Sequence, residues 1–186
     1  MSDKIEIVST KLIKQFNFVT SRETDIIYFY NGKIYDSKNS LSIIKEQTEI
    51  QILNCTVKDR NETIQKIKSK TYRDLKDFDS NPFKYTLVNG ILDIKKMKLT
   101  PHTSKNLSKI LIPCSFYTPK PNDLKKTLFW KYLTSSFTIN ENTNTENIET
   151  VLEMMAATFI RQSIDEKSFI NLGTGENGKS VLLDYL

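Results

Sequence analysis

Near the carboxyl end of this 186-residue chain stands the stretch Phe169-Ile-Asn-Leu-Gly-Thr-Gly-Glu-Asn-Gly-Lys-Ser180. Its last eight residues have the spacing G-x-x-x-x-G-K-[ST] of a phosphate-binding P-loop. Such a loop turns tightly and points backbone N–H groups at phosphate oxygens, which the glycines permit through positive φ angles and close backbone approach. The spacing therefore predicts an ATP site made of Gly173, Thr174, Gly175, Glu176, Asn177, Gly178, Lys179 and Ser180.

The last two residues of this loop have separate expected roles. The Lys179 ammonium reaches the β- and γ-phosphates, and the Ser180 hydroxyl is the expected ligand of Mg²⁺. Residues 168–172 have the pattern of a short strand, and residues 181–186 have that of a helix, whose N-terminal end attracts the anion. The alternative is a glycine-rich turn between strand and helix that binds no nucleotide.

A P-loop enzyme also needs an acidic strand that holds Mg²⁺, and usually an arginine that reaches the γ-phosphate. Six residues follow Ser180 in the chain. We therefore expect a fragment of a longer protein or a truncated gene product, inactive in ATP hydrolysis on its own.

Positive charge is concentrated in one part of the chain. The formal net charge of the whole chain is +5, whereas residues 95–131 contain nine lysines and a single acidic residue, Asp123. Clustered lysines favour a polyanionic partner such as DNA, although a solvated surface explains them equally well. The DNA contacts expected in this segment are Lys95, Lys96, Lys98, Lys105 and Lys109.

Several other classes of protein are disfavoured. Cys55 and Cys114 lack metal-ligand spacing, and we expect buried free thiols in a reducing cytoplasm. His102 is the only histidine, which argues against a Ser-His-Asp triad or a site of several histidines. No run approaches the roughly 18 apolar residues of a membrane span, and no apolar signal core begins the chain. We expect a cytoplasmic protein without a membrane partner.

Residues 1–80 have the pattern of a helix, a hairpin and two further helices. Apolar residues at helical spacing predict a first helix over residues 2–16, and Asn31-Gly32 between two β-rich runs predicts a hairpin over residues 26–35. Ser40 is expected to cap a second helix, and a third helix is expected over residues 60–71. The aromatic residues Tyr28, Phe29, Tyr30 and Tyr35 fit a base-stacking platform, but hairpin packing is the favoured alternative.

Residues 81–165 have a different pattern, of short strands followed by helices. Strands are expected over 85–88, 91–94, 97–99 and 109–112, and a polar loop over 140–145. One helix is expected from Asn122, with Leu124, Leu128, Tyr132, Leu133 and Phe137 on its apolar face, and a last one with Ile148, Val151, Leu152, Met155 and Phe159. The fold class is thus α+β: a small winged-helix-like domain over 1–80, a strand and linker segment over 81–165, and the first strand and P-loop of an α/β motor over 166–186.

The loop sequence Gly-Thr-Gly-Glu-Asn-Gly-Lys-Ser resembles the G-x-G-x-N-G-K-S of superfamily 3 helicases, with Asn177 as the telling residue. Upstream segments resemble those that precede the motor of the poxvirus, phage and plasmid primase-helicases. These segments are Val88-Asn-Gly-Ile-Leu-Asp-Ile94, Leu99-Thr-Pro-His102, Ile112-Pro-Cys-Ser-Phe-Tyr-Thr-Pro119 and Trp130-Lys-Tyr-Leu133.

The resemblance implies a replication protein whose AAA+-like motor forms a hexameric ring on DNA and uses ATP and Mg²⁺. It implies a site of action in the host cytoplasm or at a viral replication site. The sequence supports two hypotheses: a fragment of an ATP-dependent DNA helicase or primase-helicase, or a non-catalytic basic DNA-binding or assembly module with an inert P-loop.

Overall fold

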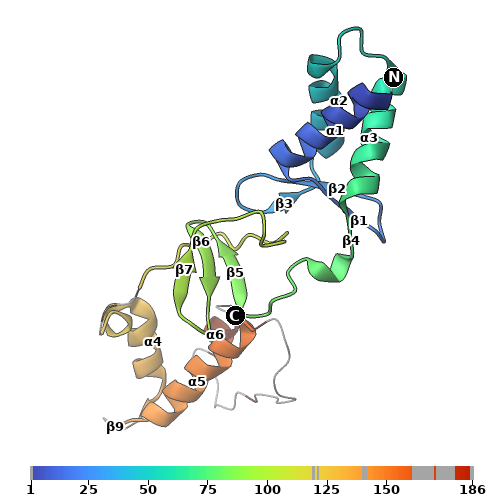
Figure 1. Cartoon of the computed structure of the whole chain (residues 1–186). Coiled ribbons are helices and arrows are strands. Elements are labelled where there is room, and N and C mark those ends of the chain that lie inside the picture. Colours follow the sequence, from blue (N-terminus) through green and yellow to red (C-terminus); the bar gives the residue numbers. More distant parts are fainter. Residues whose placement is uncertain are drawn as a thin grey trace. The chain divides into compact units, whose positions relative to one another are not determined.

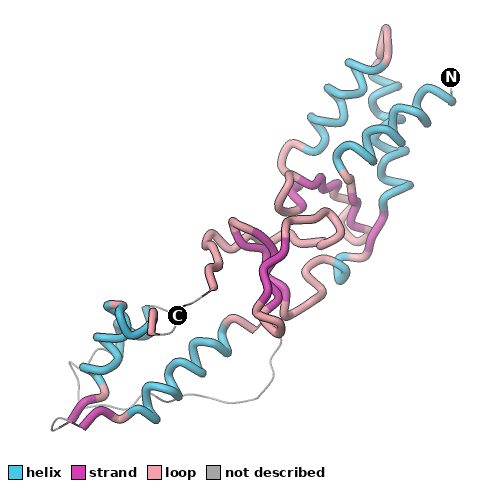
Figure 2. Tube along the Cα trace, turned by 60° about the vertical axis from the view of Figure 1, so that its left-hand side comes forward, coloured by secondary structure: helices cyan, strands magenta, loops and turns pink. Residues whose placement is uncertain are grey.

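The computed structural model describes residues 2–118, 120, 122–139, 142–160, 170 and 179–184. It has a mixed α+β fold of helices and small sheets. The chain divides into two compact units, Met1–Phe116 and Tyr117–Leu186 (Figures 1 and 2). The division into 1–80, 81–165 and 166–186 stays a prediction. The expected first motor strand, residues 168–172, lies outside the described residues except for Ile170, which is exposed and in neither helix nor strand.

Three helices form one end of the first unit: α1 (Ser2–Phe16), α2 (Ser40–Gln51) and α3 (Val57–Thr71). They lie side by side in Figure 1 and bury the apolar stripes that their sequences predict. The core comprises Ile5, Val8, Leu12, Phe18, Ile27, Ile44, Ile52, Ile64 and Ile67. The expected helices are therefore confirmed. The N-terminal ends of two helices differ from the expected ones. Asn39, not Ser40, is the residue that precedes α2, and α3 begins at Val57 rather than at residue 60, because the Thr56 side chain caps it.

A four-stranded sheet in the order β3-β2-β1-β4 packs beside these helices. Its strands are β1 (Val19–Ser21), β2 (Ile27–Tyr30), β3 (Tyr35–Asp36) and β4 (Tyr72–Arg73). The predicted hairpin is confirmed, with Tyr30 opposite Tyr35 in an antiparallel pair. The Asn31 side-chain oxygen accepts hydrogen bonds from the N–H groups of Lys33 and Ile34, both at 3.0 Å, and so shapes the connecting loop.

A short 3₁₀ turn, η1 (Leu75–Asp77), leads to an antiparallel sheet in the order β5-β6-β7. Its strands are β5 (Lys84–Leu87), β6 (Gly90–Asp93) and β7 (Lys98–Thr100). Gly90 has φ +153°, and a Cβ there would lie 2.5 Å from the Thr100 carbonyl oxygen, so the β6–β7 pairing requires glycine.

The strand predicted over residues 109–112 is wrong. Only an isolated bridge joins Ile112 to Leu87. The Lys109 N–H donates to the Asp79 carboxylate at 3.1 Å. This N–H is therefore not available for pairing with a strand of the sheet. The expectation of two buried thiols is also wrong, because Cys114 is exposed and Cys55 is only half-buried.

The second unit contains η2 (Leu124–Lys126), α4 (Leu128–Ser136), β8 (Thr138–Ile139), β9 (Asn142–Thr143), α5 (Thr145–Thr158) and α6 (Lys179–Asp184). Its buried core is Leu133, Ile148, Val151, Met154 and Leu182.

Four expectations for this unit need correction. The helix expected from Asn122 begins at Leu128, because the Thr127 hydroxyl accepts a hydrogen bond from the Trp130 N–H and caps it there. Leu124 and Leu128, both expected on the apolar face, are 42% and 81% exposed. The loop expected over 140–145 includes β9, which pairs with β8, and Phe159, beyond the end of α5, is exposed.

Candidate functional site

The residues of the predicted ATP site are only partly described. Residues 173–178 lie outside the described part of the chain, whereas Lys179 and Ser180 begin α6. The helix expected after the loop is thus present. Ser180 is exposed, and Leu182, two residues further on, is buried in the core of the second unit.

The five lysines expected to contact DNA lie in the first unit, at two places. Lys95 and Lys96 are in the turn between β6 and β7, and Lys98 begins β7. The Lys95 ammonium lies 3.8 Å from the centre of the Phe83 ring. Lys105 and Lys109 follow in the segment after β7, where Lys109 lies over the rings of Phe78 and Tyr28.

Lys105 lines a polar pocket of about 420 Å³, which we call the β4–β5 pocket. Two segments of the chain form it: residues 73–84, from the end of β4 through η1 to the start of β5, and residues 105–107 in the loop after β7. Its lining residues are Arg73, Asp77, Asp79, Ser80, Asn81, Lys84, Lys105, Asn106 and Leu107. Sequence reasoning missed Arg73 and Lys84, because both precede residues 95–131, the segment in which lysines are concentrated.

Asp79 ties the walls of the pocket together. One carboxylate oxygen accepts from the Ser108 hydroxyl at 2.6 Å, and the other from the Lys109 N–H at 3.1 Å. The Asp79 N–H donates to the Leu107 carbonyl at 2.8 Å. Asp79 has φ +49°, a left-handed conformation that aspartate tolerates better than most residues. The carboxylate therefore holds two segments of chain at a fixed separation.

The aromatic residues of the hairpin pack against the same walls. Tyr35 is buried and donates its hydroxyl to the Ser104 carbonyl at 2.9 Å, and its N–H donates to the Ser108 carbonyl at 2.7 Å. Phe78 is also buried, with its ring centre 6.0 Å from that of Tyr35. Val19, Tyr28, Tyr30 and Leu107 complete this cluster, whereas Phe29 packs on the core of the three helices. These contacts support the hairpin-packing alternative over a base-stacking platform.

This environment changes the acidity of the Tyr35 hydroxyl. Burial raises the pKa of Tyr35 to about 12, and the nearby Tyr30 adds to the rise, while the positive charge of Arg73 opposes it. The phenol is therefore neutral at physiological pH and serves as a hydrogen-bond donor.

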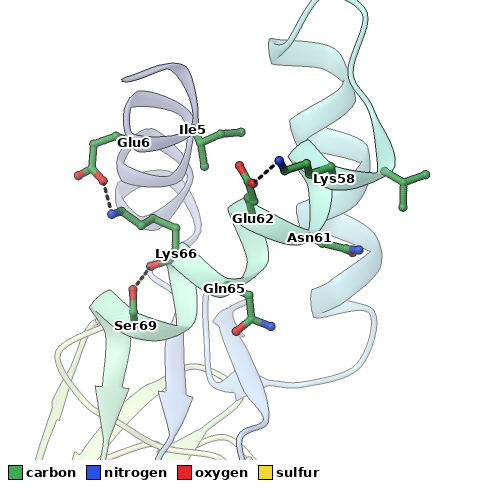
Figure 3. Close-up of a pocket in the computed structure, with 9 residues that line it drawn as sticks. Ile5, Glu6, Lys58, Asn61, Glu62, Gln65, Lys66 and Ser69 are labelled. Atoms are coloured by element: carbon green, nitrogen blue, oxygen red, sulfur yellow. Dashed lines mark hydrogen bonds and ion pairs between the residues drawn. The ribbon is translucent and has the colours of Figure 1, made fainter. Parts of the chain in front are cut away.

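A larger hollow of about 840 Å³ lies between α1 and α3, and its charges are paired among themselves (Figure 3). The Lys66 ammonium is 3.1 Å from the Glu6 carboxylate, and Lys58 is 3.8 Å from Glu62. Both lysines that line this hollow are thus neutralised locally, and it offers an anion no unpaired cation among its lining residues.

The β4–β5 pocket differs in this respect. Within the described part of the chain, Arg73, Lys84 and Lys105 form no ion pair. Helix α3 shows the opposite arrangement, because its cations all pair with acidic residues: Lys58–Glu62, Arg60–Glu49, Lys66–Glu6, Lys68–Asp25 and Lys70–Glu6. Unpaired positive charge in a polar concave site is the arrangement that binds anions.

Two kinds of feature are absent from the described residues: a cluster of metal-ligating side chains and a membrane-spanning helix. Among those described, no three His, Cys, Asp or Glu side chains gather in a way that could hold a metal ion. None of the described helices is long and apolar enough to cross a membrane.

Comparison with models of protein families finds a match for most of the chain. The family model described as D5 N terminal like matches residues 10–167, a span that includes the whole β4–β5 pocket and ends before the P-loop spacing. No curated protein matches the chain. The family is the N-terminal domain of D5-like primase-helicases, proteins of DNA replication. Because the match covers most of the length of this chain, the chain belongs to the D5 N terminal like family.

Proposed function

We propose that this chain is part of an ATP-dependent DNA helicase or primase-helicase that acts in viral, phage or plasmid DNA replication. The observation that carries the proposal is the order of two features. The family match over residues 10–167 is followed directly by the P-loop spacing over residues 173–180. In this view residues 1–80 are a winged-helix-like accessory domain, and residues 166–186 open an AAA+-like motor that assembles as a hexameric ring on DNA.

Within that motor each residue of the P-loop spacing has a task. The backbone N–H groups of residues 173–178 hold the phosphates of ATP, Lys179 neutralises charge that develops on the γ-phosphate, and the Ser180 hydroxyl ligates Mg²⁺. The position of Lys179 and Ser180 at the start of α6 supports these roles. A bound metal ion supplies charge neutralisation between the phosphates. The site of action is the host cytoplasm or a viral replication site.

DNA binding is assigned to the lysines of the first unit. From residue 77 to residue 116 the lysines are Lys84, Lys95, Lys96, Lys98, Lys105 and Lys109. In the described structure none of these lysines forms an ion pair. Lysines that no carboxylate neutralises are available to neutralise phosphates and release counterions. The same observation also favours the second candidate function, a basic DNA-binding or assembly module whose P-loop is inert.

Nucleotide binding separates the two candidates. We expect a fluorescent ATP analogue with Mg²⁺ to bind the chain, and Lys179→Ala to weaken binding by at least about tenfold, since a charge-assisted contact to phosphate is lost. Lys45→Ala is the matched control, because Lys45 is an exposed lysine of α2 without an ion pair among the described residues. Equal affinities for the native chain and Lys179→Ala would contradict the motor proposal and favour the inert module.

A further inference from the structure

We propose that the β4–β5 pocket binds a terminal phosphate group, either at the end of a DNA strand or on a nucleoside polyphosphate. This inference rests on the proposed function in DNA replication and adds to it a specific site, with Arg73, Lys84 and Lys105 as the residues that recognise the phosphate. A concave pocket of about 420 Å³ admits a phosphate with part of its nucleoside. A terminal phosphate enters such a pocket more readily than an internal one, whose two ester links must both leave it.

The three cations have complementary chemistry. The Arg73 guanidinium is planar and donates two parallel hydrogen bonds to a pair of phosphate oxygens, whereas the ammonium groups of Lys84 and Lys105 act as mobile point charges. A terminal phosphate carries close to two negative charges at neutral pH, compared with one for an internal phosphodiester. The electrostatic gain from unpaired cations therefore favours the terminal group.

The walls of the pocket are held in place before any ligand arrives. Besides the bonds of Asp79, the Asn106 side-chain amide donates to the Thr86 hydroxyl at 3.2 Å, which ties the loop after β7 to β5. The Asn81 side-chain oxygen accepts from the Phe83 N–H at 3.0 Å, which fixes the turn before β5. A site that is preorganised in this way loses less conformational entropy on binding.

Two carboxylates in the lining, Asp77 and Asp79, affect how tightly the pocket binds phosphate. Both oxygens of Asp79 already accept hydrogen bonds from the walls, so its carboxylate is committed to structure. Asp77 lies in η1 and forms no ion pair with a described residue. A bound phosphate is repelled by Asp77, and the removal of that charge is therefore expected to tighten binding.

The test compares two short single-stranded oligonucleotides of one sequence, with a 5′-phosphate or a 5′-hydroxyl, by fluorescence anisotropy. The measured quantity is the ratio of their affinities, in which general DNA binding cancels. We expect the native chain to prefer the phosphorylated strand by about tenfold or more. Arg73→Gln, Lys84→Gln and Lys105→Gln should each move the ratio towards one, and Asp77→Asn should raise it. Lys45→Gln, which removes one exposed charge from α2, should leave it unchanged.

A second arm distinguishes the source of the phosphate. ATP and inorganic pyrophosphate compete for the phosphorylated strand in the Lys179→Ala background, which removes the P-loop contribution. Competition at concentrations that leave the 5′-hydroxyl strand bound would identify polyphosphates as ligands of the same pocket. Its absence, with the strand preference intact, would restrict the site to DNA ends.

Failure of this inference and failure of the proposed function give different results. DNA binding with a ratio of one in the native chain would overturn the pocket assignment and leave the proposed function standing. A preference that Asp77→Asn does not change, or that Lys45→Gln lowers as much as the pocket variants do, would also overturn it, because the effect would then follow net charge alone. Lys84 and Lys105 are exposed side chains, so their variants remain informative even if Arg73→Gln is unstable.

Discussion

Tyr35 shows how one buried side chain links the hairpin to the loop that lines the β4–β5 pocket. Its hydroxyl donates to the Ser104 carbonyl, and burial raises its pKa from the ordinary value of 10 to about 12. Between these pH values the unfolded chain has lost a proton that the folded chain keeps, so the free energy of unfolding falls as the pH rises. The size of this fall is on the order of 3 kcal/mol, since each pH unit between the two values contributes about 1.4 kcal/mol.

Tyr35→Phe is therefore expected to lower stability at about pH 8 by roughly 1 kcal/mol, for the lost hydrogen bond, and to weaken the fall at alkaline pH. Denaturant unfolding across this pH range measures both effects. Tyr117→Phe is the control, because Tyr117 is 78% exposed and its loss should leave the pH dependence unchanged. The same alkaline slope in Tyr35→Phe and the native chain would contradict the assignment.

Residue-scale contacts are also where sequence reasoning reaches its limit. The cluster of Arg73, Lys84 and Lys105 was not predictable, because these residues belong to different elements and line one pocket only when β4 and β5 are in place. The strand predicted over residues 109–112 was wrong for the same reason. Its apolar pattern is local, but the Lys109 N–H donates to the carboxylate of Asp79, which lies thirty residues earlier in the chain.

At the scale of single elements, α3 depends on its first turn. The Thr56 hydroxyl accepts from the Asp59 N–H at 3.1 Å, and the Asp59 carboxylate accepts from the Thr56 N–H at 2.9 Å, which is a complete capping box. Thr56→Ala should cost about 1 kcal/mol of unfolding free energy, measured by urea denaturation. Ser42→Ala, at an exposed position inside α2, should cost less than half of this, and an equal loss in both variants would show that the cap contributes nothing specific.

Helices were the elements best predicted from sequence, for a physical reason. A stripe of apolar residues along a helix depends only on local spacing, and Ile5, Val8 and Leu12 are indeed buried together. Element ends depend on caps that short patterns do not separate. Asn122 and Thr127 are both residues that commonly precede a helix, and the structure uses Thr127.

On the scale of the whole molecule, the two compact units have separate buried cores. Ile67 lies in the core of the three helices and Ile148 in that of the second unit, and both are at most 1% exposed. The single tryptophan, Trp130, packs against the second core, so its fluorescence reports on that unit.

Replacement of either isoleucine by alanine should remove roughly 2–5 kcal/mol from the unit that contains it. Ile148→Ala should therefore shift the fluorescence-detected unfolding transition to lower denaturant, whereas Ile67→Ala should leave that transition in place and shift the transition seen by circular dichroism. Equal shifts of the tryptophan signal in both variants would mean that the two units unfold as one.

The unpaired lysines of the first unit predict that DNA binding depends on salt concentration. If the unpaired lysines of the first unit neutralise DNA phosphates, the logarithm of the binding constant falls linearly with the logarithm of salt concentration, with a slope set by the number of phosphates contacted. Reversal of charge at Lys95, Lys96 and Lys98 should flatten this slope, measured with one DNA duplex over a series of salt concentrations. Reversal at Lys58, Lys66 and Lys70 is the matched control, because these lysines already pair with Glu62 and Glu6. A slope that changes equally in both triple variants would mean that DNA responds to net charge and not to the β6–β7 surface.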